Sequence, residues 1–203
     1  MKGLIIKDFY SLVKQLRMYI LFIAVMTFIP GFSMITFAVV YTTMLPMTSI
    51  AYDERSKWDK LAAMMPYSAT DIVLSKYILG ALLVLGTAVF ACFAQAIVGI
   101  FTNTALTGLF FIKLAFVVCF AFVMESIELP VLIRFGVEKG RLLIILFMVL
   151  VGVGGATLID NVTDFISKDF KLAVFLPFAA LAAVAVTALS AFISAKLYEG
   201  NKE

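Results

Sequence analysis

Histidine does not occur anywhere in this sequence of 203 residues. Its absence excludes zinc sites of the HExxH type, catalytic triads built on histidine and histidine proton relays. The two cysteines, Cys92 and Cys119, both lie within apolar runs and have no CxxC spacing. We therefore interpret them as buried apolar side chains and expect no redox centre and no metal site.

Charge is also scarce. Charged residues make up 14% of the chain and hydrophobic residues 64%, with a mean hydropathy of +1.10. Soluble domains carry about a quarter of their residues as charges, so this composition indicates that lipid is the main solvent. The net charge of +3 is small, and the basic residues lie between apolar segments, which excludes a nucleic-acid-binding surface. At this length we expect one transmembrane domain, residues 1–203.

A nucleotide-binding loop is missing as well, because no Gly-Lys dipeptide occurs in the chain. The Walker A motif needs that pair to hold phosphates. We therefore expect no enzymatic activity and no cofactor in this chain. If ATP drives the protein, a separate ATPase polypeptide binds the ATP and Mg²⁺.

The apolar runs predict an all-α membrane protein with about six transmembrane helices. Residues 1–17 place Ile5, Phe9, Leu12, Val13 and Leu16 on one face and charges on the others, which predicts an amphipathic helix at the membrane interface. The alternative, a signal peptide, lacks a cleavage site after the next apolar residues. The predicted spans share residues 18–52 for a short first pair, interrupted at 30–31, and then occupy 77–101, 109–133, 142–159 and 172–195.

Lysine and arginine are distributed unequally between the two sets of loops. Of the 16 basic residues, 13 fall on the side that holds both termini, and the other side holds only Lys113, Lys168 and Lys171. The positive-inside rule then places both termini in the cytoplasm. An even number of spans satisfies this orientation.

The longest polar interruption is residues 53–76, which carries four acids and four bases. Trp58, Leu61, Met64 and Met65 share one face of a short helix that a proline ends. Ser68 and the residues after it match a capping box and predict the start of the next helix. The segment is either a docking element for a partner or a solvated linker, and the residues alone favour neither.

Two carboxylates, Glu125 and Glu128, lie one helical turn apart within the fourth span. At 1.5 Å per residue, Glu125 is roughly 13 Å from Arg134, inside the apolar layer. Such residues face a cavity or a partner. They either line a translocation pathway and meet cationic substrate groups, or pair with bases of residues 1–17 or 134–141. Without further site residues, catalysis by this pair is not expected.

Three stretches carry a resemblance to a known family: KGLIIKDFYSL, AYDERSKWDKLAAMMPYSATDIVLSKY and RFGVEKGR. The chain resembles ABC-2 type transporter permeases, in the small single-domain branch that includes membrane subunits of phenol-soluble modulin exporters and similar bacterial peptide exporters. The likeness covers nearly the whole chain. The shortened first hairpin departs from the usual spacing.

The resemblance implies an exporter of amphipathic, antimicrobial or cytotoxic peptides, built as a permease dimer with separate ATPase subunits in the bacterial cytoplasmic membrane. It implies that residues 53–66 form the main coupling helix and that residues 134–141 form a second cytoplasmic contact. The residues expected to couple to the ATPase are Asp53, Glu54, Arg55, Lys57, Trp58, Leu61, Glu138 and Arg141.

Other classes remain open alongside this reading. The chain could be the substrate-capturing subunit of a vitamin importer or a small secondary transporter, although no inverted repeat is visible. It could also be a non-transporting membrane protein that gives immunity to peptides. Ions, lipids and hydrophobic drugs remain alternative substrates.

Overall fold

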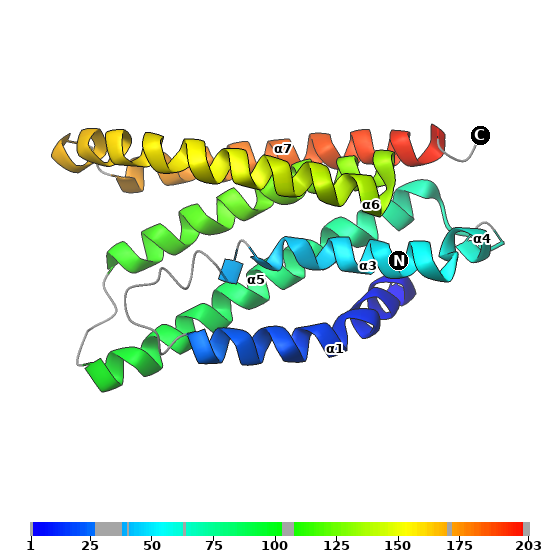
Figure 1. Ribbon diagram of the computed structural model, residues 1–203, viewed down its shortest axis with the longest axis horizontal. Helices are drawn as coiled ribbons and strands as arrows, with labels where there is room; N and C mark the ends of the chain where they lie inside the picture. The colour runs from blue at the N-terminus through cyan, green and yellow to red at the C-terminus, as the bar shows by residue number, and fades with distance from the viewer. Residues whose placement is uncertain are drawn as a thin grey trace.

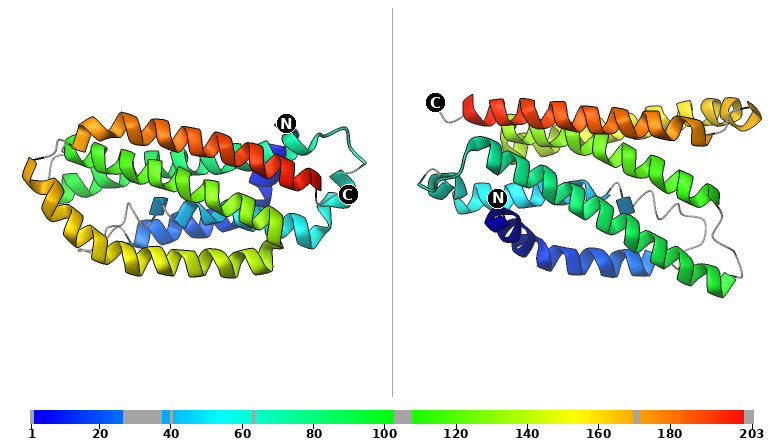
Figure 2. Two further views of the ribbon diagram at one scale, coloured as in Figure 1. Left: turned by 90° about the horizontal axis from the view of Figure 1, so that it is seen from above. Right: turned by 180° about the vertical axis from the view of Figure 1, so that it is seen from behind.

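Long helices lie alongside one another in this chain and turn back at two ends of a bundle (Figures 1 and 2). The computed structural model describes the backbone of residues 2–26, 38–39, 41–62, 64–102, 108–169 and 172–200. The elements in these ranges are α1 (Lys2–Met26), α3 (Met44–Ser56), α4 (Trp58–Ala62), α5 (Ala69–Thr102), α6 (Gly108–Asp169) and α7 (Leu172–Gly200). The predicted all-α class is confirmed for this part of the chain. The interruption predicted at residues 30–31 lies outside it.

The first helix differs from its prediction in length and in buried face. α1 continues from Lys2 through the predicted boundary at residue 17 to Met26, so residues 1–17 do not form a separate element. Within residues 2–17 its buried positions are Leu4, Asp8 and Leu12, whereas Phe9 is half exposed. The helix therefore packs against the bundle along a stripe that has a carboxylate at its centre.

The sixth element consists of two arms that Gly136 separates. This glycine has φ 75° and ψ 169°, and the backbone is helical on both sides of it. The first arm (residues 108–135) and the second arm (residues 137–169) run back along each other, as Figures 1 and 2 show. The break is thus much shorter than the loop predicted at residues 134–141. A positive φ of this kind is accessible to glycine at little cost.

The corner between α3 and α5 depends on two capping residues. Lys57 ends α3 in the left-handed conformation, with φ 52° and ψ 39°, and its N–H is directed at the carbonyls of Asp53 and Glu54. Glycine or asparagine usually occupies such a position. Ser68 Oγ accepts a hydrogen bond from the Asp71 N–H at 3.1 Å, so the N-cap that the capping-box pattern predicts is present. The short helix α4 lies between these two caps.

Both termini lie at the same end of the bundle as α4 and the turn between the arms of α6 (Figure 1). Three apolar stretches of the described chain are long enough to cross a membrane: Ala69–Ile97, Phe110–Phe147 and Phe175–Gly200. The second of them includes the turn at Gly136 and so contains parts of both arms. Large apolar side chains such as Phe93, Leu181 and Phe192 are exposed on these helices, as lipid contact requires.

Candidate functional site

Four charged side chains meet between α1, α3 and α5. Lys76 Nζ lies 2.7 Å from Asp8 Oδ1 and 2.5 Å from Asp53 Oδ2. Lys7 Nζ lies 2.6 Å from Asp53 Oδ1 and 3.0 Å from Asp8 Oδ1. Lys76 also donates to Ser49 Oγ at 3.0 Å. Each cation therefore contacts both anions, and we name Lys7, Asp8, Asp53 and Lys76 the charge cluster.

The charge cluster is largely removed from water. The side chain of Asp8 is 1% exposed and that of Lys76 is 7% exposed. Taking such charges out of water costs several kcal/mol per ion unless their partners stay in place. The three helices consequently cannot separate at this point without leaving a buried charge unpaired.

The short helix α4 is attached to the charge cluster through its tryptophan. Lys7 Nζ lies 4.1 Å from the centroid of the Trp58 ring, within the range of a cation–π contact. Trp58 also packs against the buried side chains of Leu4, Ala62 and Ile72. The position of α4 is thus linked to the charges that hold α1, α3 and α5 together.

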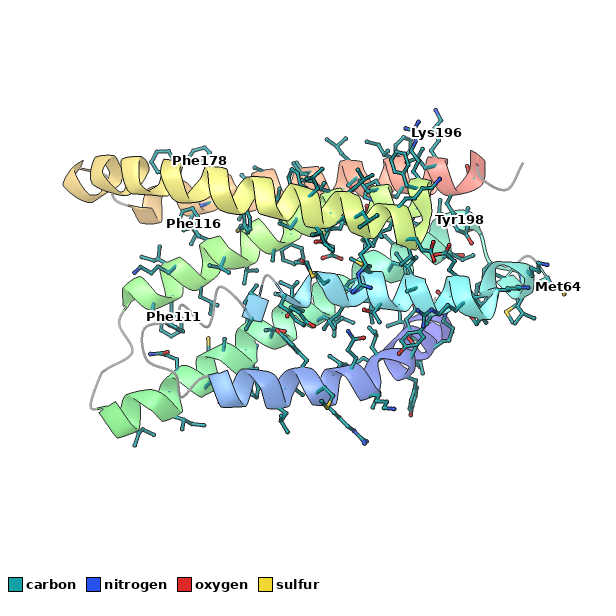
Figure 3. All side chains as sticks on the ribbon, viewed as in Figure 1. Met64, Phe111, Phe116, Phe178, Lys196 and Tyr198 are labelled. Atoms are coloured by element: carbon teal, nitrogen blue, oxygen red, sulfur yellow. The ribbon has the colours of Figure 1, made fainter. Side chains whose placement is uncertain are left out.

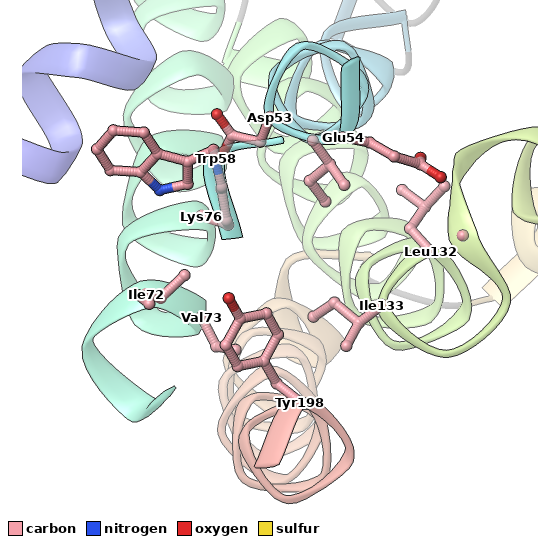
Figure 4. A pocket seen from close by; sticks show the side chains of 11 residues that line it. Asp53, Glu54, Trp58, Ile72, Val73, Lys76, Leu132, Ile133 and Tyr198 are labelled. Atoms are coloured by element: carbon pink, nitrogen blue, oxygen red, sulfur yellow. The ribbon is translucent and has the colours of Figure 1, made fainter. Parts of the chain in front are cut away.

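A pocket of 260 Å³ opens beside these residues (Figure 4). Asp53, Trp58 and Lys76 form one part of its wall, and Ile133 and Tyr198 form the part that faces them in the figure. The pocket therefore brings together residues of α3, α4, α5, the first arm of α6 and α7. Its lining residues are Ile50, Asp53, Glu54, Trp58, Ile72, Val73, Lys76, Leu132, Ile133, Gly136 and Tyr198.

Glu54 fixes the turn of α6 against the end of α3. Its Oε2 accepts a hydrogen bond from the Val137 N–H at 3.1 Å. Its Oε1 would lie 3.5 Å from a Cβ added at Gly136. This carboxylate satisfies a backbone donor at the start of the second arm, and it keeps α3 and that arm side by side.

The two glutamates of the first arm are buried within the bundle. Glu125 is 2% exposed and Glu128 is 3% exposed. Glu128 Oε1 accepts a hydrogen bond from Thr43 Oγ1 at 3.3 Å. Within the described part of the chain, neither carboxylate oxygen of Glu125 has a hydrogen-bond partner. No lysine or arginine in these ranges forms an ion pair with either glutamate, which disfavours the local pairing alternative.

Gly80 of α5 provides the space that the Glu125 carboxyl occupies. A Cβ built at Gly80 would lie 1.8 Å from Glu125 Oε1 and 2.4 Å from its Cδ. The carboxyl group therefore lies directly on the backbone of α5. Tyr77, one turn before Gly80 on α5, contacts two hydroxyl groups of α7. Its Oη lies 2.6 Å from Ser190 Oγ and 2.9 Å from Ser194 Oγ.

Glu128 also lines an apolar pocket of 230 Å³ between the two arms of α6. The other lining residues are Met124, Ile127, Val131, Leu143, Ile144 and Phe147. The wall of this pocket is almost entirely apolar, and the Glu128 carboxyl group is hydrogen-bonded to Thr43. The two glutamates thus have different surroundings. The Glu125 carboxyl lies against the backbone of α5, and Glu128 is at the edge of the pocket between the two arms.

The residues expected to couple to an ATPase fall into two groups. Asp53, Glu54 and Trp58 make the contacts within the chain described above. The others have exposed side chains: Arg55, Lys57, Leu61, Glu138 and Arg141. Beside Leu61, the side chains of Met64 and Met65 are also exposed.

Sequence reasoning did not identify Lys7, Asp8 and Lys76 as a site. Lys7 and Asp8 are predicted on the polar face of an interfacial helix, and Lys76 is counted as a topology signal and as one of the bases of residues 53–76. One signal was available, because Asp8 lies four residues from both Leu4 and Leu12 and so shares their face. Its partner Lys76 is 68 residues away along the chain, and local spacing gives no signal for that contact.

Comparison with known proteins identifies the family. The family model for ABC-2 family transporter proteins matches residues 3–199, so this chain belongs to that family and is a multi-pass membrane component of a transporter. No curated protein and no solved structure matches the chain.

Proposed function

We propose that this ABC-2 family protein is the membrane-spanning permease of an ATP-driven exporter, and that a separate ATPase subunit moves it by pressing on α4. The supporting observation is the attachment of α4 to the charge cluster through Trp58 and Lys7. A displacement of α4 therefore changes the contacts of α1, α3 and α5 together. ATP and Mg²⁺ are held by the partner, and this chain converts the movement into rearrangement of its helices.

The surface for that partner lies at the tip of the bundle. Leu61 is 50% exposed and Met64 is 84% exposed, and Figure 3 shows Met64 beyond the end of the long helices. We name Leu61, Met64 and Met65 the docking tip. Burying large apolar side chains of this kind contributes about 1.5–3 kcal/mol each. The exposed charges Lys57 and Glu138 set the orientation of the partner and add little affinity.

The arrangement in the membrane follows from the same proposal. The chain crosses six times, and α1, α3, α5, the two arms of α6 and α7 each contribute to one pass. Both termini face the bacterial cytoplasm, where the ATPase acts. A second permease copy completes the pathway.

The exported molecules are amphipathic peptides with cationic groups. Glu125 and Glu128 offer buried carboxyl groups without a lysine or arginine partner among the described residues, and Glu128 is one of the residues that line the apolar pocket between the arms of α6. An ammonium or guanidinium group of the peptide meets these carboxyls during passage. The alternatives are a vitamin-importer subunit, a secondary transporter and an immunity protein. None of these three exports peptides by means of an ATPase that binds the docking tip.

Coupling is tested by co-expressing this chain with candidate ABC ATPase subunits and purifying the complex. We expect Leu61→Ala combined with Met64→Ala to lose most of the co-purifying ATPase, because both exposed side chains are removed. Leu181→Ala, which truncates a side chain on α7 that is 70% exposed, is the matched control and should retain the ATPase. Trp58→Ala should bind the ATPase but lose peptide-stimulated ATP hydrolysis in liposomes. If the docking-tip variant binds and stimulates like the parent, the coupling assignment is wrong.

The pathway is tested by export of a labelled cationic peptide in proteoliposomes. Glu125→Gln combined with Glu128→Gln should lower export while the purified protein keeps its unfolding midpoint. Glu199→Gln removes an exposed acid at the end of α7 and should have no effect. Unchanged export together with a lower unfolding midpoint would show that the two carboxyls serve only the fold.

A further inference from the structure

A third pocket, of 340 Å³, lies between α1, α3 and the second arm of α6. It begins at Tyr41 and reaches Arg55 and Arg141 at its other end. At the helical rise of 1.5 Å per residue, the 14 residues from Tyr41 to Arg55 extend roughly 21 Å. The pocket is therefore a groove parallel to the helices, with both guanidinium groups near one end.

The two arginines come from different elements and are brought together by the turn of α6. Glu54 accepts the hydrogen bond of the Val137 N–H, which holds the start of the second arm against the last turn of α3. Arg55 and Arg141 then line the same groove. Neither forms an ion pair with a carboxylate of the described chain. The two acids that precede Arg55 are engaged elsewhere, since Glu54 binds the turn and Asp53 binds the lysines.

The remainder of the groove is mixed, with polar side chains at Gln15, Thr48 and Tyr41 and apolar side chains beside them. Tyr52 lies one turn before Arg55, and Met44, Leu45 and Ile145 line the part farther from the arginines. A cationic end and an apolar body match a molecule that has an anionic head and a hydrocarbon tail. The length also fits, because half of a hydrocarbon core of about 30 Å plus one headgroup layer of about 5–7 Å amounts to roughly 20–22 Å.

We propose that this groove binds an anionic phospholipid, with its phosphate between Arg55 and Arg141 and one acyl chain along α3 and the second arm of α6. Basic pockets between membrane helices recognise lipid headgroups in this way. The proposal stands apart from the substrate pathway, because Glu125 and Glu128 are absent from this groove. Only the choice of leaflet rests on the proposed cytoplasmic position of the termini, and that leaflet is the one rich in anionic lipid.

The test uses the full-length protein, purified in detergent and stripped of lipid. Phosphatidylglycerol and phosphatidylcholine with identical acyl chains are added in parallel, and a third sample receives inorganic phosphate alone. We expect phosphatidylglycerol to raise the unfolding midpoint and to remain bound in native mass spectra, whereas the other two additions have little effect. Equal shifts by the two lipids overturn the proposal, and a shift by phosphate alone identifies an anion pocket instead of a lipid site.

Variants locate the effect. Arg55→Gln with Arg141→Gln should lower the affinity for phosphatidylglycerol roughly 30-fold, the value expected for two arginines at an anionic surface. Lys14→Gln with Arg17→Gln removes the same charge from exposed positions of α1 and should leave the affinity unchanged.

A third variant keeps the test decisive if the arginine variant does not fold. Ile145→Trp fills the apolar part of the groove and should also abolish the preference for phosphatidylglycerol. Retention of that preference in this variant overturns the proposal. Loss of the lipid effect in the Lys14 and Arg17 control also overturns the proposal, because it shows nonspecific attraction. A change of oligomeric state in the groove variants overturns it too, because it shows that another copy of the chain covers the groove.

Discussion

Replacing Lys76 with methionine removes the ammonium that contacts both anions of the charge cluster. Asp8 is 1% exposed, and its Oδ1 then keeps only the contact with Lys7 at 3.0 Å. Breaking a buried ion pair by removing one partner costs about 3–5 kcal/mol. Methionine fills much of the same volume, and Lys7 still binds Asp53 at 2.6 Å. We therefore expect a loss of unfolding free energy near the lower limit, about 3 kcal/mol.

The assay is denaturant unfolding of the full-length protein in mixed micelles, followed by fluorescence. Trp58 is the only tryptophan of the chain, and it lies against Lys7 of the same cluster, so its emission reports on this site. Lys14→Met is the matched control, because it removes an exposed lysine from α1. Its effect should be small.

A double-mutant cycle separates the ion pair from general damage to packing. Lys76→Met combined with Asp8→Asn should cost clearly less than the sum of the two single changes, since no unpaired charge is left buried. Additive losses would refute the reasoning. A Lys76→Met protein as stable as the Lys14→Met control would refute it too.

The remaining predictions concern α5 and the topology. Gly80→Ala should destabilise the protein by about 1–3 kcal/mol through overpacking. The reason is that the added Cβ would lie 1.8 Å from Glu125 Oε1. Combining it with Glu125→Ala should relieve most of that loss in the denaturant assay. Gly86→Ala on the same helix meets no atom within 4 Å and should instead be neutral or stabilising, by up to about 1 kcal/mol; a loss equal to that of Gly80→Ala would contradict the packing argument. In whole cells, a cysteine at position 104 should react with an impermeant thiol reagent and Lys57→Cys should not; labelling at position 57 from outside would reverse the orientation.

Local patterns identified the features that depend on neighbouring residues. The Ser68 cap was predictable because its partner is three residues away. The burial of Glu125 and Glu128 was predictable because apolar residues surround them in sequence. The end of the first helix was not, since an amphipathic stretch and an apolar stretch can share one continuous helix, as Lys2–Met26 does.

The candidate site was predicted only in part. Residues 53–66 were recognised as an unusual polar segment, but the direction in which its side chains face was not available from spacing. Asp53 and Trp58 point into the bundle, whereas Met64 is exposed. The inward orientation follows from contacts with Lys7 and Lys76, which lie on other helices.

By itself, the sequence determined the membrane environment, the helical class, the lack of a nucleotide-binding loop and the resemblance to ABC-2 permeases. Each follows from composition, from periodicity or from short motifs. Only the tertiary structure decided that Asp8, Asp53 and Lys76 form one cluster, that Gly80 receives the Glu125 carboxyl, and that Arg55 and Arg141 share a groove. These contacts join residues that are far apart in the chain. Helix packing selects such partners through shape and the cost of burying charge, and neither quantity is written in local sequence.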